Sequence, residues 1–244
     1  MNSRRFDMLL LAAAFLLFWA MAARLAGPDA LSTPVATLSR AVSLLTAVSF
    51  WDDVAATGHT MLWACMIVLA GGLTAGLLVG SSRLATQVVE PMLGPLYSIP
   101  KITLYPVILL IFGLTPSATI SFAAIHGIFP VMIFTINGIR QVPPIYERSA
   151  RVMKLNRFQM IRSILIPAAL PEIVAGLRVG FSTTLLGAII AELFASTAGM
   201  GFLLIRATEA HDVIDIMAIT AILFAFAITA NSLLMRLERH VRHG

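Results

Sequence analysis

Charged residues and cysteine are both scarce in this 244-residue chain. Only 12% of the residues are charged, whereas 59% are hydrophobic, and the mean hydropathy is +0.91. A soluble domain of this length has no interior large enough to bury so much apolar surface, so lipid must surround much of the chain. The single cysteine, Cys65, excludes an intrachain disulfide, and its place in an apolar run indicates a thiol packed among helices.

Phosphate-binding and metal-binding patterns are missing as well. The two lysines, Lys101 and Lys154, follow Pro100 and Met153. A phosphate-binding loop needs a glycine-rich turn directly before its lysine, so the chain offers no loop of that type for ATP hydrolysis. Among the histidines only the pair His240 and His243, in a basic tail, has helical ligand spacing. We therefore expect no catalytic, cofactor-binding or metal-binding residues and no enzyme activity.

The apolar residues form six segments that we expect to cross a membrane. Five satisfy the requirement for about 20 apolar residues, and the sixth is short, contains Pro106 and is expected to begin near residues 99–101, with Lys101 reaching the interface. The first segment also resembles a secretory signal peptide, but its apolar run is longer than a signal core, which favours an uncleaved helix. The expected spans are about Phe6–Ala26, Thr60–Gly80, Ile102–Leu114, Ser117–Gly138, Ile173–Ala198 and Val213–Met235.

The distribution of basic residues predicts the orientation of these spans. If the N-terminus is cytoplasmic, only Arg24, Arg40 and Arg206 of the 17 lysines and arginines lie outside. This bias follows the positive-inside rule and predicts that both termini face the cytoplasm. The net charge of +5 is then explained by an anionic inner leaflet, with membrane lipid rather than nucleic acid as the partner.

Two further patterns concern the spans and their connections. Gly72, Gly76 and Gly80 recur at four-residue intervals, which lets another helix backbone approach one face of the second span. The stretch from about residue 27 to 58, with Pro28 and Pro34, indicates an external connection with some helix.

A polar, basic segment at about residues 144–167 separates the fourth and fifth spans. Pro143 and Pro144 end the fourth span and suit the first turn of a new short helix, expected over Tyr146–Met153. Asn156 followed by Gln159 resembles a capping box, so a second helix is expected to begin there and run to Leu165. Pro167 and Pro171 are expected to break the chain before the fifth span.

This segment resembles the signature of the inner-membrane permeases of binding-protein-dependent ABC importers, closest to the nitrate, sulfonate and taurine branch. The signature reads E-A-A, a glycine four residues later, and then I-x-L-P, which here is Ile164–Leu165–Ile166–Pro167. The resemblance continues through "PAALPEIVAGLRVGFSTTLLGAIIAELF", "GMGFLL" and the earlier "VEPMLGPLYSIPKITLYPVILLIFGL". It covers most of the region from about residue 60 to residue 235.

The resemblance implies an all-α membrane protein with the type I ABC importer permease fold, formed by residues 1–244 as one transmembrane permease domain. It also implies that the central segment is a coupling helix that seats on an ATPase. The motif's glutamate and glycine positions fall on Arg148 and Lys154, so the turn is expected to have another shape than a glycine would give. The implied ATPase-coupling residues are Glu147, Arg148, Ser149, Ala150, Arg151 and Lys154.

Two polar residues within the spans are candidates for the solute pathway or its gate. Glu192 lies past the midpoint of the fifth span, where a carboxylate either lines a pathway or makes a structural hydrogen bond to a neighbouring helix. His126 lies within the fourth span without an obvious acidic partner, which favours a role in helix packing.

The resemblance implies the permease subunit of an ATP-driven importer in the bacterial inner membrane, working by alternating access. The implied partners are a second permease copy, two ABC ATPases that bind ATP and Mg²⁺, and a periplasmic or lipid-anchored solute-binding protein. Two alternative functions are less favoured. The single central segment argues against the transmembrane coupling subunit of a vitamin-type (ECF-like) importer, and the lack of a nucleophile or metal cluster argues against an intramembrane enzyme. Because no arginine or lysine is expected deep in the spans, selectivity is expected to rest with the binding protein.

Overall fold

A computed structural model describes residues 2–243, apart from the side chains of residues 2–5, 8, 9, 147, 151, 157 and 241–243. Within this range the chain is helical and contains no β-strand. The elements, in chain order, are α1 (Asn2–Ala26), α2 (Pro34–Thr46), α3 (Val48–Gly80), α4 (Arg83–Ser98), η1 (Lys101–Leu104), α5 (Tyr105–Phe112), α6 (Pro116–Arg140), α7 (Pro144–Val152), α8 (Arg157–Met160), η2 (Ile161–Leu165), α9 (Ile166–Ala195), α10 (Met200–Glu209) and α11 (Val213–His243).

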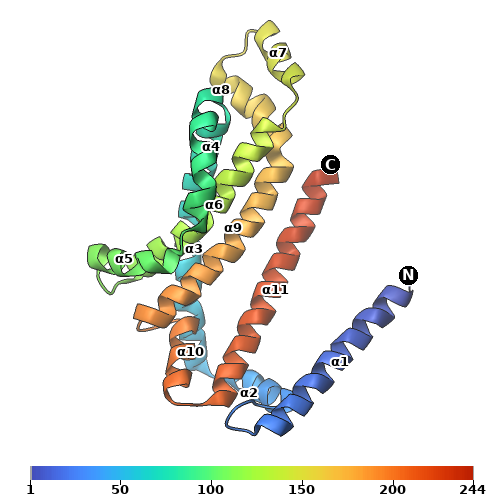
Figure 1. The fold of residues 1–244 in the computed structure, drawn as a ribbon, viewed down its shortest axis with the longest axis vertical. Coiled ribbons are helices and arrows are strands. Elements are labelled where there is room, and N and C mark those ends of the chain that lie inside the picture. The colour runs from blue at the N-terminus through green and yellow to red at the C-terminus, as the bar shows by residue number, and fades with distance from the viewer. Residues whose placement is uncertain (1, 244) are drawn as a thin grey trace.

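The chain passes back and forth along the long axis of the molecule (Figure 1). Four helices are long and apolar enough to cross a bilayer: α3, α6, the continuous helix Phe158–Ala195 and α11. The bent pair formed by α4 and the helix Lys101–Phe112 makes a fifth crossing if its two halves are taken as one span, and α1 contains a shorter apolar stretch, Leu10–Ala26. The helical architecture with four to five such spans confirms the predicted fold class.

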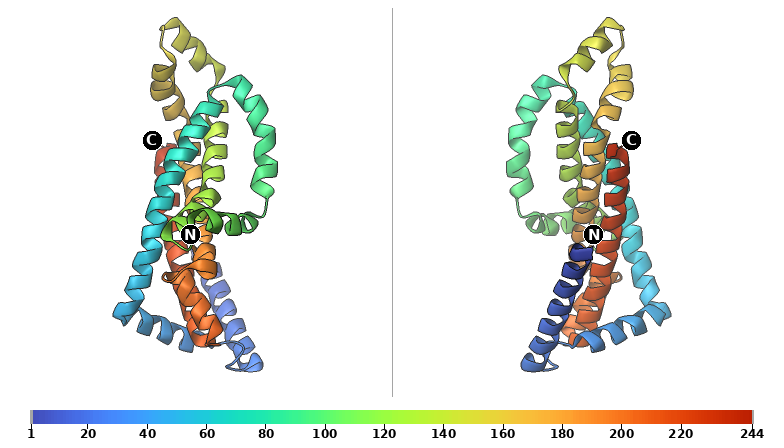
Figure 2. Two further views of the ribbon diagram at one scale, coloured as in Figure 1. Left: turned by 90° about the vertical axis from the view of Figure 1, so that its left-hand side faces the viewer. Right: turned by 90° about the vertical axis from the view of Figure 1, so that its right-hand side faces the viewer.

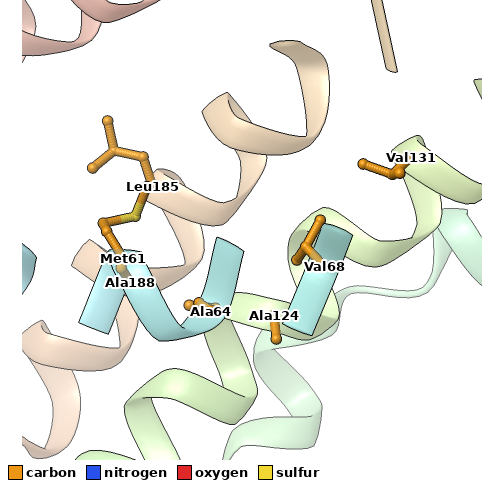
Figure 3. Packing of buried hydrophobic residues seen from close by; sticks show 8 residues of the cluster. Met61, Ala64, Val68, Ala124, Val131, Leu185 and Ala188 are labelled. Atoms are coloured by element: carbon orange, nitrogen blue, oxygen red, sulfur yellow. The ribbon is translucent and has the colours of Figure 1, made fainter. Parts of the chain in front are cut away.

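Helices α3, α6 and α9 pack into the centre of the molecule. Figure 3 labels Ala64 and Val68 from α3, Ala124 from α6 and Ala188 from α9, which belong to one buried apolar cluster. The predicted role of the regular glycines on α3 is confirmed at Gly76, where an added Cβ would lie 2.5 Å from the Cβ of Thr135 on α6. Small residues thus bring α3 and α6 to backbone contact, as in other membrane helix pairs.

The predicted second span was too short, because α3 begins at Val48 rather than near residue 60. The external connection before it contains α2, whose N-terminus is capped by a hydrogen bond from the backbone N–H of Ala36 to Thr33 Oγ1. The sequence signal was weak here because Asp52 and Asp53, near the beginning of α3, lower the local hydropathy.

The prediction for the third span was wrong. Instead of one helix that begins near Lys101, α4 runs back from the end of α3, and the chain then bends by 88° into η1 and α5. Figure 2 shows α4 descending beside the bundle and α5 lying across it. The bend falls at Pro100, which has no N–H to continue the hydrogen-bond ladder and forces Ile99 into an extended conformation.

The predicted break at Pro167 and Pro171 was also wrong, because the helix continues through both prolines. A π-helical turn, η2, precedes Pro167, and the backbone N–H of Ile166 bonds to the carbonyl of Ile161. This wider turn provides the local adjustment that a proline needs inside a membrane helix. The central segment is therefore joined to α9 by one continuous helix, Phe158–Ala195.

The two ends of the molecule differ in composition and structure. Helix α7 stands at one end, while α2, α10 and the end of α1 lie at the other (Figure 1). The three arginines predicted to be external, Arg24, Arg40 and Arg206, belong to the last turn of α1, to α2 and to α10. Arg40 forms an ion pair with Asp215 of α11, and this hydrogen bond raises the pKa of the Arg40 guanidinium above its usual value.

Candidate functional site

Helix α7 projects from the bundle and exposes apolar side chains. Ile145, Tyr146, Val152 and Met153 have 61%, 49%, 82% and 69% of their surface exposed. A helix of nine residues is marginal by itself in water, and exposed apolar side chains cost free energy unless a partner covers them. The projecting helix therefore has the form of a docking element.

The turn after α7 holds a lysine in a left-handed conformation. Lys154 has φ of 54°, and the N–H of Leu155 bonds to the carbonyl of Ala150 at 3.0 Å. This is the Schellman arrangement that normally ends with glycine. The expectation of another turn shape was wrong, because the hydrogen bond compensates for a strain of about 1 kcal/mol in a residue with a Cβ.

The predicted capping box at the start of α8 is present. The backbone N–H of Asn156 donates to Gln159 Oε1 at 2.9 Å, and the N–H of Gln159 donates to Asn156 Oδ1 at 2.8 Å. These reciprocal bonds satisfy two of the donors that a helix N-terminus leaves free. The segment after the turn is thus fixed at the point where it enters the long helix toward α9.

The base of the segment is attached to the bundle by a small apolar cluster. Val142, which follows α6, packs with Leu165 of η2 and with Ile139, Ala169 and Ile173. These residues come from the end of α6 and the beginning of the long helix. The base of α7 is therefore held against the end of α6 and the beginning of the long helix.

The residues predicted to couple to an ATPase lie along α7 and its turn. The side chains of Arg148, Ser149 and Lys154 are exposed, whereas Ala150 has only 1% of its surface exposed. Ala150 thus supports the segment, and the exposed residues are available to a partner. The side chains of Glu147 and Arg151 lie outside the described part of the structure.

Glu192 lies far from α7, near the opposite end of α9, and is 2% exposed. Its Oε2 accepts hydrogen bonds from Thr57 Oγ1 on α3 at 2.9 Å and from the backbone N–H of Gly201 on α10 at 3.0 Å. Thr57 Oγ1 in turn accepts from the N–H of Met200 at 2.8 Å. One carboxylate therefore connects three helices, and a role of Glu192 in the pathway stays a prediction.

The loop between α9 and α10 fits closely around this carboxylate. Gly199 has φ of 118°, and a Cβ there would lie 2.5 Å from Cδ of Glu192. The N–H of Gly199 donates to Asp53 Oδ1 on α3 at 2.7 Å. Only glycine combines this backbone conformation with this close approach.

His126 lies in the middle of α6 and packs between aromatic and small residues. Its ring centroid is 4.5 Å from that of Phe122, and its Nδ1 lies 3.0 Å from the Phe122 carbonyl. An added Cβ at Gly187 on α9 would lie 2.9 Å from Cγ of His126. This geometry provides a packing role at the contact of α6 and α9, and a function in the pathway is untested.

Sequence reasoning missed two features of this arrangement. It did not identify the apolar side chains of α7 as a surface, and it placed Lys101 at the membrane interface. The structure places Lys101 at the bend between α4 and α5, with Nζ 5.8 Å from the ring centroid of Phe129, near the middle of α6. The length of chain between Gly80 and Pro116 was the available signal, because it is long enough for an additional helix.

Comparisons with known proteins match this architecture. Residues 68–243 match the family described as "Binding-protein-dependent transport system inner membrane component". The nitrate import permease protein NrtB of Leptolyngbya laminosa is 31% identical over 153 residues, which are 63% of this chain and 54% of that protein. The bicarbonate transport system permease protein CmpB of Synechococcus elongatus is 28% identical over 79% of this chain and 69% of that protein. The chain thus spans about half the length of the nitrate relative.

The fold is also found among solved structures. A chain of the MetNI methionine ABC transporter in an inward-facing conformation aligns with a TM-score of 0.68 at 18% identity. The alignment covers 78% of this chain and 94% of that chain. At this identity the likeness concerns the fold alone.

Proposed function

This chain belongs to the family of binding-protein-dependent transport system inner membrane components, and on that premise we propose that it is the permease subunit of an ATP-driven importer. It forms the solute pathway and takes energy from a separate ATPase that binds ATP and Mg²⁺. The observation that carries the proposal is α7, a projecting helix with exposed apolar side chains. Family membership makes an ATPase the partner expected to cover it.

The structure suggests how ATPase closure would move the pathway. Helix α7 is joined through residues 141–143 to α6 and through the turn, α8 and η2 to α9. These two helices pack against each other along their lengths, with Gly138, Gly176 and Gly180 at close contacts. A shift of α7 would therefore tilt α6 and α9 as one body, which is the rigid-body motion that alternating access requires.

The proposed assembly contains two copies of this chain, two ATPases and a solute-binding protein. Helix α1 stands apart from the central bundle (Figure 1), and apolar side chains such as Leu11 and Phe18 are 69% and 70% exposed. Lipid and a second permease copy would cover them. In this assembly α7 and both termini face the cytoplasm, and α2 and α10 face the binding protein.

The proposed solute is a small anion. The two relatives are named for nitrate and bicarbonate, which are both oxyanions with a single negative charge. The binding protein would select among anions before the passage admits one.

The proposal is tested by purifying the permease with its ATPase and disturbing α7 at its surface. Tyr146→Asp places a charge on the exposed apolar face while Ala150, the buried support, is untouched. We expect at least a tenfold loss of copurifying ATPase and of ATP-driven uptake. Leu84→Asp, an equally non-conservative change at an exposed residue in the first turn of α4, serves as the matched control.

The control variant should retain the ATPase and import solute at the wild-type rate. Wild-type protein that copurifies with no ATPase when both are coexpressed would contradict the proposed function. Equal retention of the ATPase by the wild type and the Tyr146→Asp variant would contradict the assignment of α7 as the docking element.

A further inference from the structure

Lys101 is a cation at the middle depth of the helix bundle. Helix α4 begins at the α7 end of the molecule and contains 16 residues, so it carries the chain about 24 Å along the axis before the bend. The ammonium group of Lys101 then lies 5.8 Å from the ring centroid of Phe129, near the middle of the 25-residue span α6. Lys101 therefore lies beside the middle of a spanning helix rather than at its end.

The ammonium group has weak partners and no counter-ion. Nζ donates one hydrogen bond to the carbonyl of Tyr97 at 3.1 Å and lies 4.3 Å from the Tyr97 ring centroid. Among the described side chains, the ion pairs join Arg40, Arg140 and Arg178 to carboxylates, and none involves Lys101. Of the three N–H donors of an ammonium, two are therefore available to another group.

This arrangement does not suit a side chain that faces lipid. A lysine at the centre of a bilayer costs about 2.5–3.5 kcal/mol or more, and the centre is about 15 Å from either edge of the hydrocarbon core. The four-carbon stem cannot cover that distance, and here it turns back toward Tyr97 instead. A partly exposed lysine side chain at this depth therefore requires water or an anion beside its ammonium group.

We propose that Lys101 is a specificity-determining residue of the solute passage, where its ammonium group receives the small anion at the middle of the membrane. The inference rests on the proposed function and adds the residue that favours an anion over a neutral solute. It also replaces the expectation that no lysine or arginine lies within the spans.

The neighbours of Lys101 explain why such a site would pass an anion rather than retain it. Tyr97 and Phe129 hold the ammonium through ring faces, which is worth about 0.5–2 kcal/mol and leaves the charge unneutralised. A single charge without a surrounding set of donors attracts an anion without fixing its geometry. Conduction requires this balance between entry and release.

The first test is uptake by proteoliposomes that contain the permease with its ATPase and binding protein. The probes are nitrate, bicarbonate and ethanesulfonate, and the comparison uses those that the wild-type complex imports. Lys101→Met, which keeps length and removes charge, should reduce uptake at least tenfold, while Lys101→Arg should keep most of it. Arg83→Met, an exposed cation in the first turn of α4, is the matched control and should transport normally.

The second test measures access to water and does not require a known solute. The reaction is measured in a Cys65→Ser background in two states, one without nucleotide and one with ATP and vanadate. Lys101→Cys should react with the anionic reagent sulfonatoethyl methanethiosulfonate in at least one of them. Ile228→Cys on α11, at an apolar residue that is 67% exposed, is the lipid-facing control and should react at least tenfold more slowly. An excess of the transported anion should slow the reaction at residue 101.

The outcomes separate this inference from the proposed function. Wild-type uptake that Lys101→Met leaves unchanged overturns the role of Lys101 and leaves the permease intact. A wild-type complex that imports none of the probes contradicts the proposed solute class, and the cysteine reaction then decides the position of Lys101 by itself. If Lys101→Cys reacts no faster than Ile228→Cys in both states, the residue does not face the passage.

Discussion

Glu192 provides the sharpest test of how the α10 end of the molecule is held together. The Glu192→Ala variant removes an acceptor of two hydrogen bonds, from Thr57 Oγ1 and from the N–H of Gly201, in a site where Glu192 is 2% exposed. The substitution leaves buried donors without an acceptor, and each unsatisfied donor costs about 1–3 kcal/mol. We expect the free energy of unfolding to fall by about 2–4 kcal/mol.

The effect is measured as the midpoint of thermal unfolding of the purified complex in detergent. For a chain of this size about 1 kcal/mol lowers the midpoint by about 2–4 °C, so Glu192→Ala should lower it by about 5–15 °C. Thr57→Val removes the hydroxyl bonded to Glu192 and Met200 but keeps the shape, and should show an intermediate loss. Glu192→Gln keeps an acceptor and should lose less than Glu192→Ala.

An unchanged midpoint in Glu192→Ala would refute the reasoning that this carboxylate connects α3, α9 and α10. A loss of uptake without a loss of thermal stability would assign Glu192 to the pathway instead. If Glu192→Gln unfolds at the wild-type temperature but loses more than tenfold of its uptake, the carboxylate acts on the solute or on the gate rather than on packing.

Three further predictions concern the docking segment and the helix contacts. Lys154→Gly should relieve the left-handed strain and stabilise the turn by about 1 kcal/mol, seen as slower amide hydrogen exchange in α7; faster exchange would contradict this. Asn156→Ala should remove one hydrogen bond of the capping box and reduce the stability of the helix start by about 1 kcal/mol, seen as faster amide hydrogen exchange confined to α8 and the π-turn. Unchanged exchange in these residues would exclude a capping role. Gly76→Leu should drive α3 away from Thr135 and lower the free energy of unfolding by about 1–3 kcal/mol, measured by thermal unfolding. Gly58→Leu, on the same helix but with no atom within 4 Å of an added Cβ, should be tolerated, and equal losses in the two variants would argue against close packing at Gly76.

The sequence predicted those features that depend on local patterns. Long apolar runs specified the membrane helices, because only a helix satisfies its own backbone hydrogen bonds in lipid. Asn156 and Gln159 predicted their capping box, because that interaction joins residues three apart. Glycines at four-residue spacing predicted a close helix contact, although not that α6 would be the helix in contact.

Only the tertiary structure decided the features that depend on residues distant in the sequence. The carboxylate of Glu192 meets Thr57, 135 residues away, because α3, α9 and α10 pack together. Pro167 could be kept within a long helix because a π-turn before it changed the hydrogen-bond register, which the residue types alone did not indicate. Lys101 lies at mid-depth because the chain bends by 88° beside α6. Local pattern thus determined which segments are helices, and packing between helices determined where their few polar groups lie.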